Sequence, residues 1–244
     1  MGYIFIVLIL LAYCIISYFN HRRNMKLLCM VSSPNRGTKS ERNLIIRLLK
    51  NGVHPQAIFH DLYLRKKDGE YSQVDLVVAT PQGLLAIEVK DYSGWIFGKE
   101  NNKYWTQTLN YGKEKHSFYN PIKQNDGHIR ALMEQSEQMS KIPIYNIVLF
   151  TKRSVLRNVN YTEGSIFVDY TNNIMSILKK IGRLNSAEYT NKAEIACILH
   201  ASVCNGANPE IVSSHIESIK KRASQEAFPM KEKYLSFCRR KQWL

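Results

Sequence analysis

The sequence predicts an α/β protein with a mixed sheet flanked by helices and preceded by an N-terminal transmembrane helix. Two observations carry this prediction. Residues 2–19 form an uncharged, almost wholly apolar run. Beyond residue 37, strand-like hairpins and helical segments follow one another, and the run of hairpins excludes a simple alternating βα barrel. With 244 residues, 45% hydrophobic and 22% charged, the chain has the size of one globular domain with appendages.

The N-terminal run reads GYIFIVLILLAYCIISYF, and at about 1.5 Å per residue it is long enough to cross a hydrocarbon core. Arg22, Arg23 and Lys26 follow it, so the positive-inside rule places the C-terminal side in the cytoplasm. We therefore expect residues 1–23 to be a single-pass anchor in the cell membrane, with the body of the protein in the cytoplasm. A cleaved signal peptide is the main alternative, although no positive charge precedes the run and no A-x-A pattern ends it.

The chain is strongly basic, because 34 Lys and Arg residues stand against 20 Asp and Glu residues, a net charge of +14. This excess favours a polyanionic partner, either nucleic acid or an anionic membrane surface, and does not choose between them. A basic composition without such a partner is the plain alternative. The five cysteines are odd in number, widely spaced and without a C-x-x-C pair. We therefore expect reduced thiols, and neither a zinc site nor a disulfide framework.

The elements between residues 24 and 109 are predicted from breakers and periodicity. Ser, Pro, Asn and Gly residues interrupt any period over 24–36, which we interpret as a linker. A helix is expected to begin after Thr38, where Thr38 and Glu41 fit a capping box, and to end near Gly52. The strands expected next cover 56–66, 71–80, 84–92 and the two arms of a hairpin over 94–109, with turns at 67–70, at 81–83 and at 100–103.

The rest of the chain begins with a helix entered through Pro121, expected over 120–140. It continues with an apolar strand buried on both faces over 142–151, a short strand over 165–170 and a helix over 173–182. From about residue 186 the pattern is helical, with basic clusters at 220–222 and 239–241 that are either solvated or bind lipid head groups or DNA phosphates. We divide the chain into the anchor, the linker, a core over 37–150, a completion of that core over 151–185 and a helical basic region over 186–244.

A pair of carboxylates and a lysine share one face of the strands at 71–80 and 84–92. A four-residue turn at 80–83 places Asp75 opposite Glu88, whereas a two-residue turn at 82–83 places it opposite Lys90. Facing carboxylates repel by roughly a kcal/mol or more unless a cation lies between them. Mg²⁺, or Mn²⁺, suits such oxygen ligands, and Lys90 can then hold water or neutralise a phosphate. The alternative is a solvent-facing ion cluster, because this spacing arises readily by chance.

Several further motifs occur in a fixed order around this pair. They are GTKSE at 37–41, QVD at 73–75, IEVKDYSGWIFG at 87–98, Trp105 and NPIKQ at 120–124. In these motifs the chain over about 35–150 resembles the nuclease-related domain (NERD) family of the PD-(D/E)xK nuclease superfamily. The resemblance implies a restriction-endonuclease-like core. The sequence departs from the superfamily's naming motif at Val74, because that motif has proline at this position.

The resemblance also implies roles for individual residues. Asp75 and Glu88 are expected to bind the metal ion with the Val89 carbonyl as a third ligand, and Lys90 is expected to be the catalytic lysine. Glu41 would complete the acidic cluster and Gln124 would line the site. Each has a structural alternative: Glu41 as part of the capping box, Gln124 as a polar cap.

Two pairs of side chains in or near these motifs are expected to have structural rather than functional roles. His116 and His128 are interpreted as surface or core histidines rather than metal ligands. Trp95 and Trp105 are expected to pack the hairpin at 94–109, with stacking on nucleic-acid bases as the alternative.

These expectations support a membrane-anchored, Mg²⁺-dependent nuclease that hydrolyses DNA phosphodiester bonds. The alternative is a catalytically silent module, tethered at the membrane, that binds nucleic acid or a protein partner. Among nucleic acids, DNA is the expected partner, and the sequence leaves the oligomeric state open.

Overall fold

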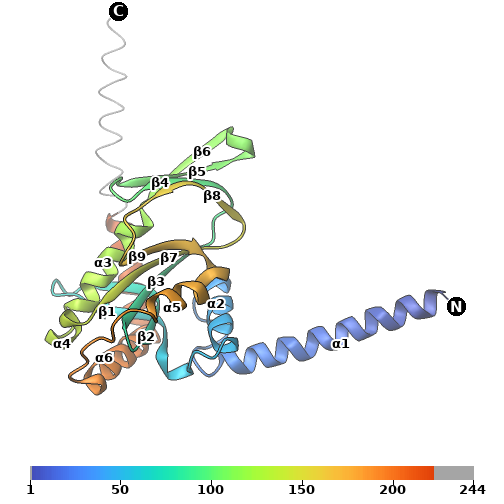
Figure 1. Ribbon diagram of the computed structural model, residues 1–244, viewed down its shortest axis with the longest axis horizontal. Coiled ribbons are helices and arrows are strands. Elements are labelled where there is room, and N and C mark those ends of the chain that lie inside the picture. Colours follow the sequence, from blue (N-terminus) through green and yellow to red (C-terminus); the bar gives the residue numbers. More distant parts are fainter. Residues whose placement is uncertain (1, 223–244) are drawn as a thin grey trace, which may run out of the picture.

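The computed structural model describes residues 2–222 and contains two mixed sheets flanked by helices (Figure 1). The five-stranded sheet has the order β1 (Ile58–Arg65), β2 (Tyr71–Thr80), β3 (Gly83–Lys90), β7 (Ile144–Phe150) and β9 (Ile166–Tyr170). The four-stranded sheet has the order β6 (Glu114–Tyr119), β5 (Tyr104–Leu109), β4 (Gly94–Lys99) and β8 (Ser154–Asn160). Cys238 and the predicted basic cluster at 239–241 lie outside the described residues.

The helices are α1 (Gly2–Leu28), α2 (Lys39–Lys50), α3 (Pro121–Met133), α4 (Glu137–Lys141), α5 (Ile174–Ile181) and α6 (Lys192–Asn205). Short 3₁₀ turns occur at Pro55–Ala57, Asn110–Gly112 and Thr171–Asn173, and residues 209–222 are also helical. The predicted helix at 38–51 is confirmed, and the Thr38 side chain caps it by accepting a bond from the Glu41 backbone N–H.

The five-stranded sheet is covered on both faces. On one face, α2 and α5 pack against residues such as Leu85, Ile87 and Ile147. On the other face, α3, α4 and α6 cover β1 to β3. The four-stranded sheet covers β7 and β9 beside them, through Trp105, Ile96 and their partners Val148 and Phe150. The predicted buried strand is confirmed as β7, which lies between β3 and β9 and is parallel to both.

The register between β2 and β3 decides which residues share a face. Ala79 pairs with Leu84 and Leu76 pairs with Ile87, so Asp75 falls beside Glu88 rather than beside Lys90. The turn that produces this register has only Pro81 and Gln82 between its paired ends. Of the two registers considered from the sequence, the one that places the carboxylates together is therefore confirmed.

Several sequence expectations differ from the structure. The helix expected over 120–140 is two helices, because residues 134–136 break the period and Ser136 caps a new helix. β6 and β8 were not predicted, since both carry mainly polar residues on an exposed sheet. The region from 186 becomes helical only at Lys192. A single mixed sheet was expected, and two are present because the strands after Lys90 leave the first sheet.

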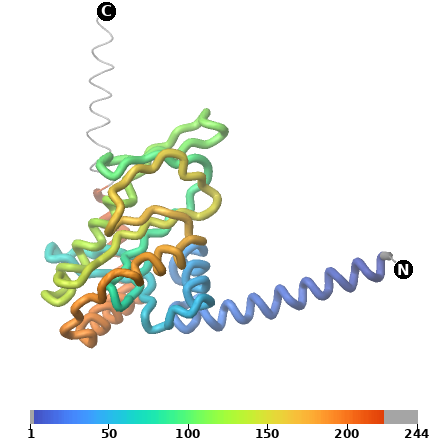
Figure 2. Tube along the Cα trace, in the orientation of Figure 1, coloured from blue at the N-terminus to red at the C-terminus, as the bar shows by residue number. Residues whose placement is uncertain are grey.

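The predicted linker at 24–36 also differs, because α1 continues through residues 24–28. Figure 2 shows α1 projecting from the body, which it meets at its C-terminal end. The helix from Tyr3 to Leu28 is long and apolar enough to cross a membrane, and its most apolar window is fully exposed. Leu28 itself is only 1% exposed and packs among Leu44, Leu48 and Ile58 in the core. The helix and the body are thus joined without a flexible connection at residues 24–28.

We predict that Leu28→Ala lowers the free energy of unfolding of the full-length chain by about 2–5 kcal/mol, because it leaves a cavity in the core. The matched control is Leu8→Ala in the same helix, where the side chain is 56% exposed and its removal leaves no cavity in the body. Thermal unfolding followed by circular dichroism in neutral detergent measures both. Equal melting temperatures for Leu28→Ala and Leu8→Ala would show that the end of α1 is not part of the core.

Candidate active site

Asp75 lies where the hydrogen-bonded ladders of β2 open on both sides. The pairing with β1 skips from Leu76 to Val74, and the pairing with β3 ends at Leu76. The Asp75 carboxylate takes the place of a backbone partner, because its Oδ2 accepts the Val89 N–H at 2.9 Å. This bond holds the carboxylate against β3, beside Glu88.

Glu88 and Lys90 point from β3 toward the side of α3. Lys90 Nζ lies 2.7 Å from Glu88 Oε1, and it also donates to Gln124 Oε1 at 2.9 Å. The Glu88 side chain is buried and that of Lys90 is 16% exposed. A lysine held between a carboxylate and an amide in this way has a fixed position, with one edge still open to solvent.

α3 supplies the wall of the site opposite the strands. Asn120 caps the helix through a bond from the Ile122 N–H, and its amide donates to the backbone carbonyls of Glu100 and Asn102 in the β4–β5 turn, both at 2.7 Å. The fully buried Asn125 donates to the Ala86 carbonyl of β3 at 2.9 Å. These bonds fix α3 against both sheets and thereby place Gln124.

His128 belongs to the site, although the sequence favours a surface or core position for it. Its Nε2 lies 3.5 Å from Glu88 Oε2, and its Nδ1 is 2.8 Å from Ser72 Oγ. The Nε2 atom is buried and has no hydrogen-bond partner within normal geometry. The signal available in the sequence was its spacing, because a residue four positions after Gln124 lies on the same helix face. His116, in contrast, is exposed on β6.

Glu41 reaches the same region from the start of α2. Its Oε1 accepts from Thr38 Oγ1 at 2.6 Å, and its Oε2 lies 3.0 Å from Nε2 of the buried His60. Ser32 Oγ contacts the other nitrogen of His60 at 2.6 Å. Gly37 stands directly over this pair, since a Cβ there would lie 2.4 Å from both side chains. Glu41 is thus both the partner of Thr38 in the capping box and a member of the acidic group.

A second set of polar side chains supports the β1–β2 edge of the site. Asp61 has a φ of 55°, a left-handed conformation that is uncommon outside glycine. Its carboxylate accepts from Arg36 Nε at 2.8 Å and from Gln73 Nε2 at 2.9 Å, and these bonds hold the irregular backbone opposite Asp75. Neither Arg36 nor Asp61 was predicted as a site residue.

The electrostatics of the site oppose ionisation of Asp75. Burial, together with the charges of Glu88 and Glu41, raises the pKa of the Asp75 carboxyl well above its usual range. Glu88 behaves in the opposite way. Burial alone would raise the pKa of Glu88, but its contacts with His128 and Lys90 lower it overall. Two neighbouring carboxyls with pKa values shifted apart are typical of a functional site.

Lys90 and Glu41 stay charged in this environment. Burial acts to lower the pKa of Lys90, but the charge and hydrogen bond of Glu88 raise it overall. Burial likewise acts to raise the pKa of Glu41, which the hydrogen bonds from His60 and Thr38 lower overall. The site therefore holds a lysine cation against the Glu88 carboxylate, with Asp75 as the carboxyl group whose ionised form is poorly compensated.

A divalent cation in this site would find few ligands from the protein. No group of three or more His, Cys, Asp or Glu side chains in residues 2–222 is arranged to hold a metal ion. A cation held by Asp75 and Glu88 with the Val89 carbonyl would need water for most of its coordination, as Mg²⁺ prefers. A cation at this position would also compensate the charge that raises the pKa of Asp75.

The structure thus brings together the predicted residues Glu41, Asp75, Glu88, Lys90 and Gln124. Their assigned roles, and that of the Val89 carbonyl, stay predictions. Trp105 is buried and unable to stack on a base.

The family model of the nuclease-related domain (NERD) matches residues 36–151. An uncharacterized protein of Bacillus anthracis is 27% identical over 191 residues, which cover 77% of this chain and 86% of that protein. This similarity is longer than the segment that the family model matches. No solved structure matches the chain, so a restriction-endonuclease-like arrangement stays a prediction. Residues 36–151 thus match the nuclease-related domain (NERD) family, whose general placement is the PD-(D/E)xK superfamily.

Proposed function

We propose that this protein is a membrane-anchored, Mg²⁺-dependent nuclease that hydrolyses DNA phosphodiester bonds at the cytoplasmic face. The observation that carries this proposal is the position of Lys90. Its ammonium is held at 2.7 Å from Glu88 and 2.9 Å from Gln124, on the strand face that also presents Asp75. The family match supports a nuclease-related role, and the identity of the substrate and metal is our inference.

Each side chain has a definite task in this proposal. Asp75, fixed by the Val89 N–H, and Glu88 hold the metal ion together with the Val89 carbonyl. The ion, when bound, supplies charge neutralisation of the phosphate and lowers the pKa of water. Lys90 donates a hydrogen bond to the attacking water or to a phosphate oxygen, and Gln124 fixes the direction of its ammonium. Glu41 adds negative charge next to Asp75.

A binding module without activity is the second candidate, and one observation favours it. Both carboxylate oxygens of Glu88 are engaged by cationic or potentially cationic groups, Lys90 at 2.7 Å and His128 at 3.5 Å. A carboxylate neutralised in this way has less affinity for a metal ion than a free one. In such a module the cluster stabilises the fold, and the excess of basic residues binds nucleic acid or a protein partner beside the membrane.

The membrane location in the proposal rests on α1. Its exposed apolar surface needs an apolar environment, and the basic residues at its C-terminal end favour the cytoplasmic side. The tether would limit the enzyme to DNA that reaches the inner surface of the membrane.

We predict that Lys90→Ala lowers the rate of DNA cleavage by at least about 100-fold, the usual effect of removing a group that stabilises developing charge. Full-length protein in neutral detergent is incubated with supercoiled, linear and single-stranded DNA and Mg²⁺. Lys180→Ala, which removes an exposed positive charge from α5 on the opposite layer, is the matched control and keeps full activity. Absence of cleavage by the folded wild-type protein with Mg²⁺ or Mn²⁺ would favour the binding module.

We predict that Asp75→Asn stabilises the protein at neutral pH in EDTA. The raised pKa means that folded Asp75 keeps its proton above 3.8, the ordinary value that applies in the unfolded chain. The contribution of Asp75 to the free energy of unfolding is therefore fully present at low pH. It is lost as the pH rises through the pKa of Asp75 in the folded protein. Asparagine keeps the bond from Val89 and removes the repulsion, so the melting temperature rises by about 2–4 °C for each kcal/mol recovered.

The same pair of proteins tests the metal site. Mg²⁺ should raise the melting temperature of the wild-type protein and leave that of Asp75→Asn nearly unchanged, because ligand binding stabilises only the folded state that binds it. Calorimetry or fluorescence melting over pH 4–8 gives both results. An Asp75→Asn variant that is less stable than the wild type in EDTA, with the same slope against pH, would contradict the charge assignment.

We predict that the cysteines of the body are protected in intact cells. A membrane-impermeant maleimide should leave Cys29, Cys197 and Cys204 unlabelled until the cells are lysed, although all three are exposed on the protein. A Cys14→Ser variant removes the thiol within the apolar run and serves as the control. Labelling of the body before lysis would reverse the proposed orientation.

A further inference from the structure

The four-stranded sheet has two unlike faces, which follow from the alternation of side chains along its strands. Ile96 and Trp105 face inward and are buried against β7 and β9. The neighbours of these two residues along each strand point outward, away from β7 and β9. The pairs Phe97–Thr106 and Tyr104–Tyr119 are therefore on the outward side. We call this second surface the outer sheet face and define it by Trp95, Phe97, Lys99, Tyr104, Tyr119 and Arg157.

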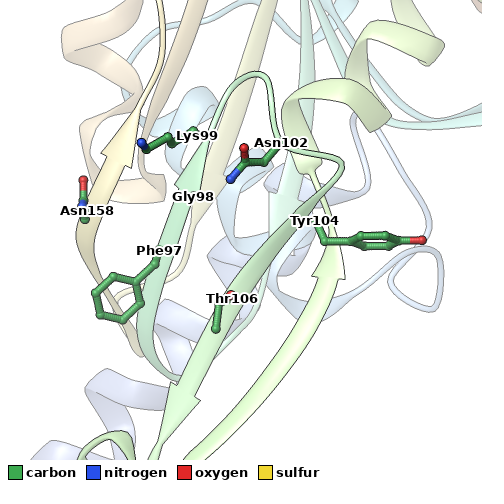
Figure 3. A pocket seen from close by; sticks show the side chains of 7 residues that line it. All are labelled: Phe97, Gly98, Lys99, Asn102, Tyr104, Thr106 and Asn158. Carbon is green, nitrogen blue, oxygen red and sulfur yellow. The ribbon is translucent and has the colours of Figure 1, made fainter. Parts of the chain in front are cut away.

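Aromatic rings lie exposed on the outer sheet face. Tyr104 is 47% and Tyr119 is 44% exposed, and their ring centroids are 6.3 Å apart at 81°. Beside Tyr104 lies a hollow of about 170 Å³, lined by Phe97, Lys99 and Asn158 among others (Figure 3). Exposed rings next to a hollow on a sheet are a surface on which flat groups can stack.

The charge on the outer sheet face is positive. The Arg157 guanidinium lies 4.7 Å from the ring centroid of Trp95, Lys103 Nζ lies 5.3 Å from that of Tyr104, and Lys99 is exposed. The described strands β4, β5, β6 and β8 contain a single acidic residue, Glu114, whose position in the alternation places it on the inner side. A polyanion meets no carboxylate from these strands on this face.

We propose that the outer sheet face binds single-stranded nucleic acid, with bases stacked on Tyr104 and Tyr119 and phosphates paired with Lys99 and Arg157. Exposed rings combined with cations and without carboxylates suit a strand whose bases are unpaired, because every base offers a flat face for stacking. A duplex hides those faces within its own stack. The +14 net charge of the chain adds attraction at longer range.

The outer sheet face is connected to the active site, and we infer that it holds the strand that the active site cuts. This role rests on the proposed function. Only Asp91, Tyr92 and Ser93 separate Lys90 at the end of β3 from Gly94 at the start of β4. Asn120 ties the β4–β5 turn to α3, which carries Gln124. The sheet that would hold the strand is therefore joined rigidly to the residues that would cut it.

The test measures binding in EDTA, so that it is independent of cleavage. Full-length protein in neutral detergent is titrated into a fluorescein-labelled oligothymidylate and followed by fluorescence anisotropy. We expect Tyr104→Ala with Tyr119→Ala to weaken binding by at least about fivefold, in line with the loss of base stacking. Tyr104→Phe with Tyr119→Phe keeps the rings and should bind like the wild type. Lys99→Ala should weaken binding and reduce its salt dependence, whereas Lys180→Ala on the opposite layer should not.

The outcomes separate this inference from the proposed nuclease activity. Loss of binding in the alanine pair but not in Lys180→Ala supports the outer sheet face, whether or not the protein cleaves DNA. Unchanged binding in the alanine pair, or equal competition by an unlabelled duplex of the same length, overturns it. A third outcome is that the body binds vesicles of anionic lipid but not oligothymidylate, and that the alanine pair loses the vesicle binding. This result would assign the outer sheet face to a membrane surface and would also overturn the inference. Melting temperatures confirm that each variant is folded.

Discussion

The structure depends on how α3 is held between the two sheets. β2 and β3 supply the charged groups of the site, and α3 supplies Gln124 beside Lys90. Because neither sheet contains both halves, the site exists only when the helix has one fixed position. The buried amides of Asn120 and Asn125 provide that position through hydrogen bonds to backbone carbonyls of the β4–β5 turn and of β3. A buried amide without these partners would cost free energy, so the bonds also exclude other positions of the helix.

The second constraint is the burial of like charges. Asp75, Glu88 and Glu41 approach one another in a region where water screens them poorly, and the pKa of Asp75 rises as a result. Lys90, His60 and His128 offset part of this repulsion. Such a group of carboxylates lowers the stability of the fold, which is a common property of sites built for chemistry rather than for packing.

The four-stranded sheet links these constraints to the surface of the protein. Its inner side packs Trp105 against Phe150, with rings stacked 6.3 Å apart, and so attaches the sheet to the core. Gly98 permits this contact, since a Cβ there would lie 2.1 Å from the Trp105 ring. Its outer side needs no packing partner, and its composition is free to serve binding.

The sequence by itself determined the long apolar helix, the capped helix at 38–51, the strands of the five-stranded sheet, two strands of the four-stranded sheet, and the grouping of Asp75, Glu88 and Lys90 on one face. These features follow from local periodicity and from alternation along strands, which act over a few residues. Only the tertiary structure decided that the strands form two sheets, that the register places Asp75 beside Glu88, and that His128 joins the site while Trp105 is buried. Those outcomes depend on contacts between segments far apart in the chain, such as Glu41 with His60 or Ser72 with His128, which local patterns do not encode.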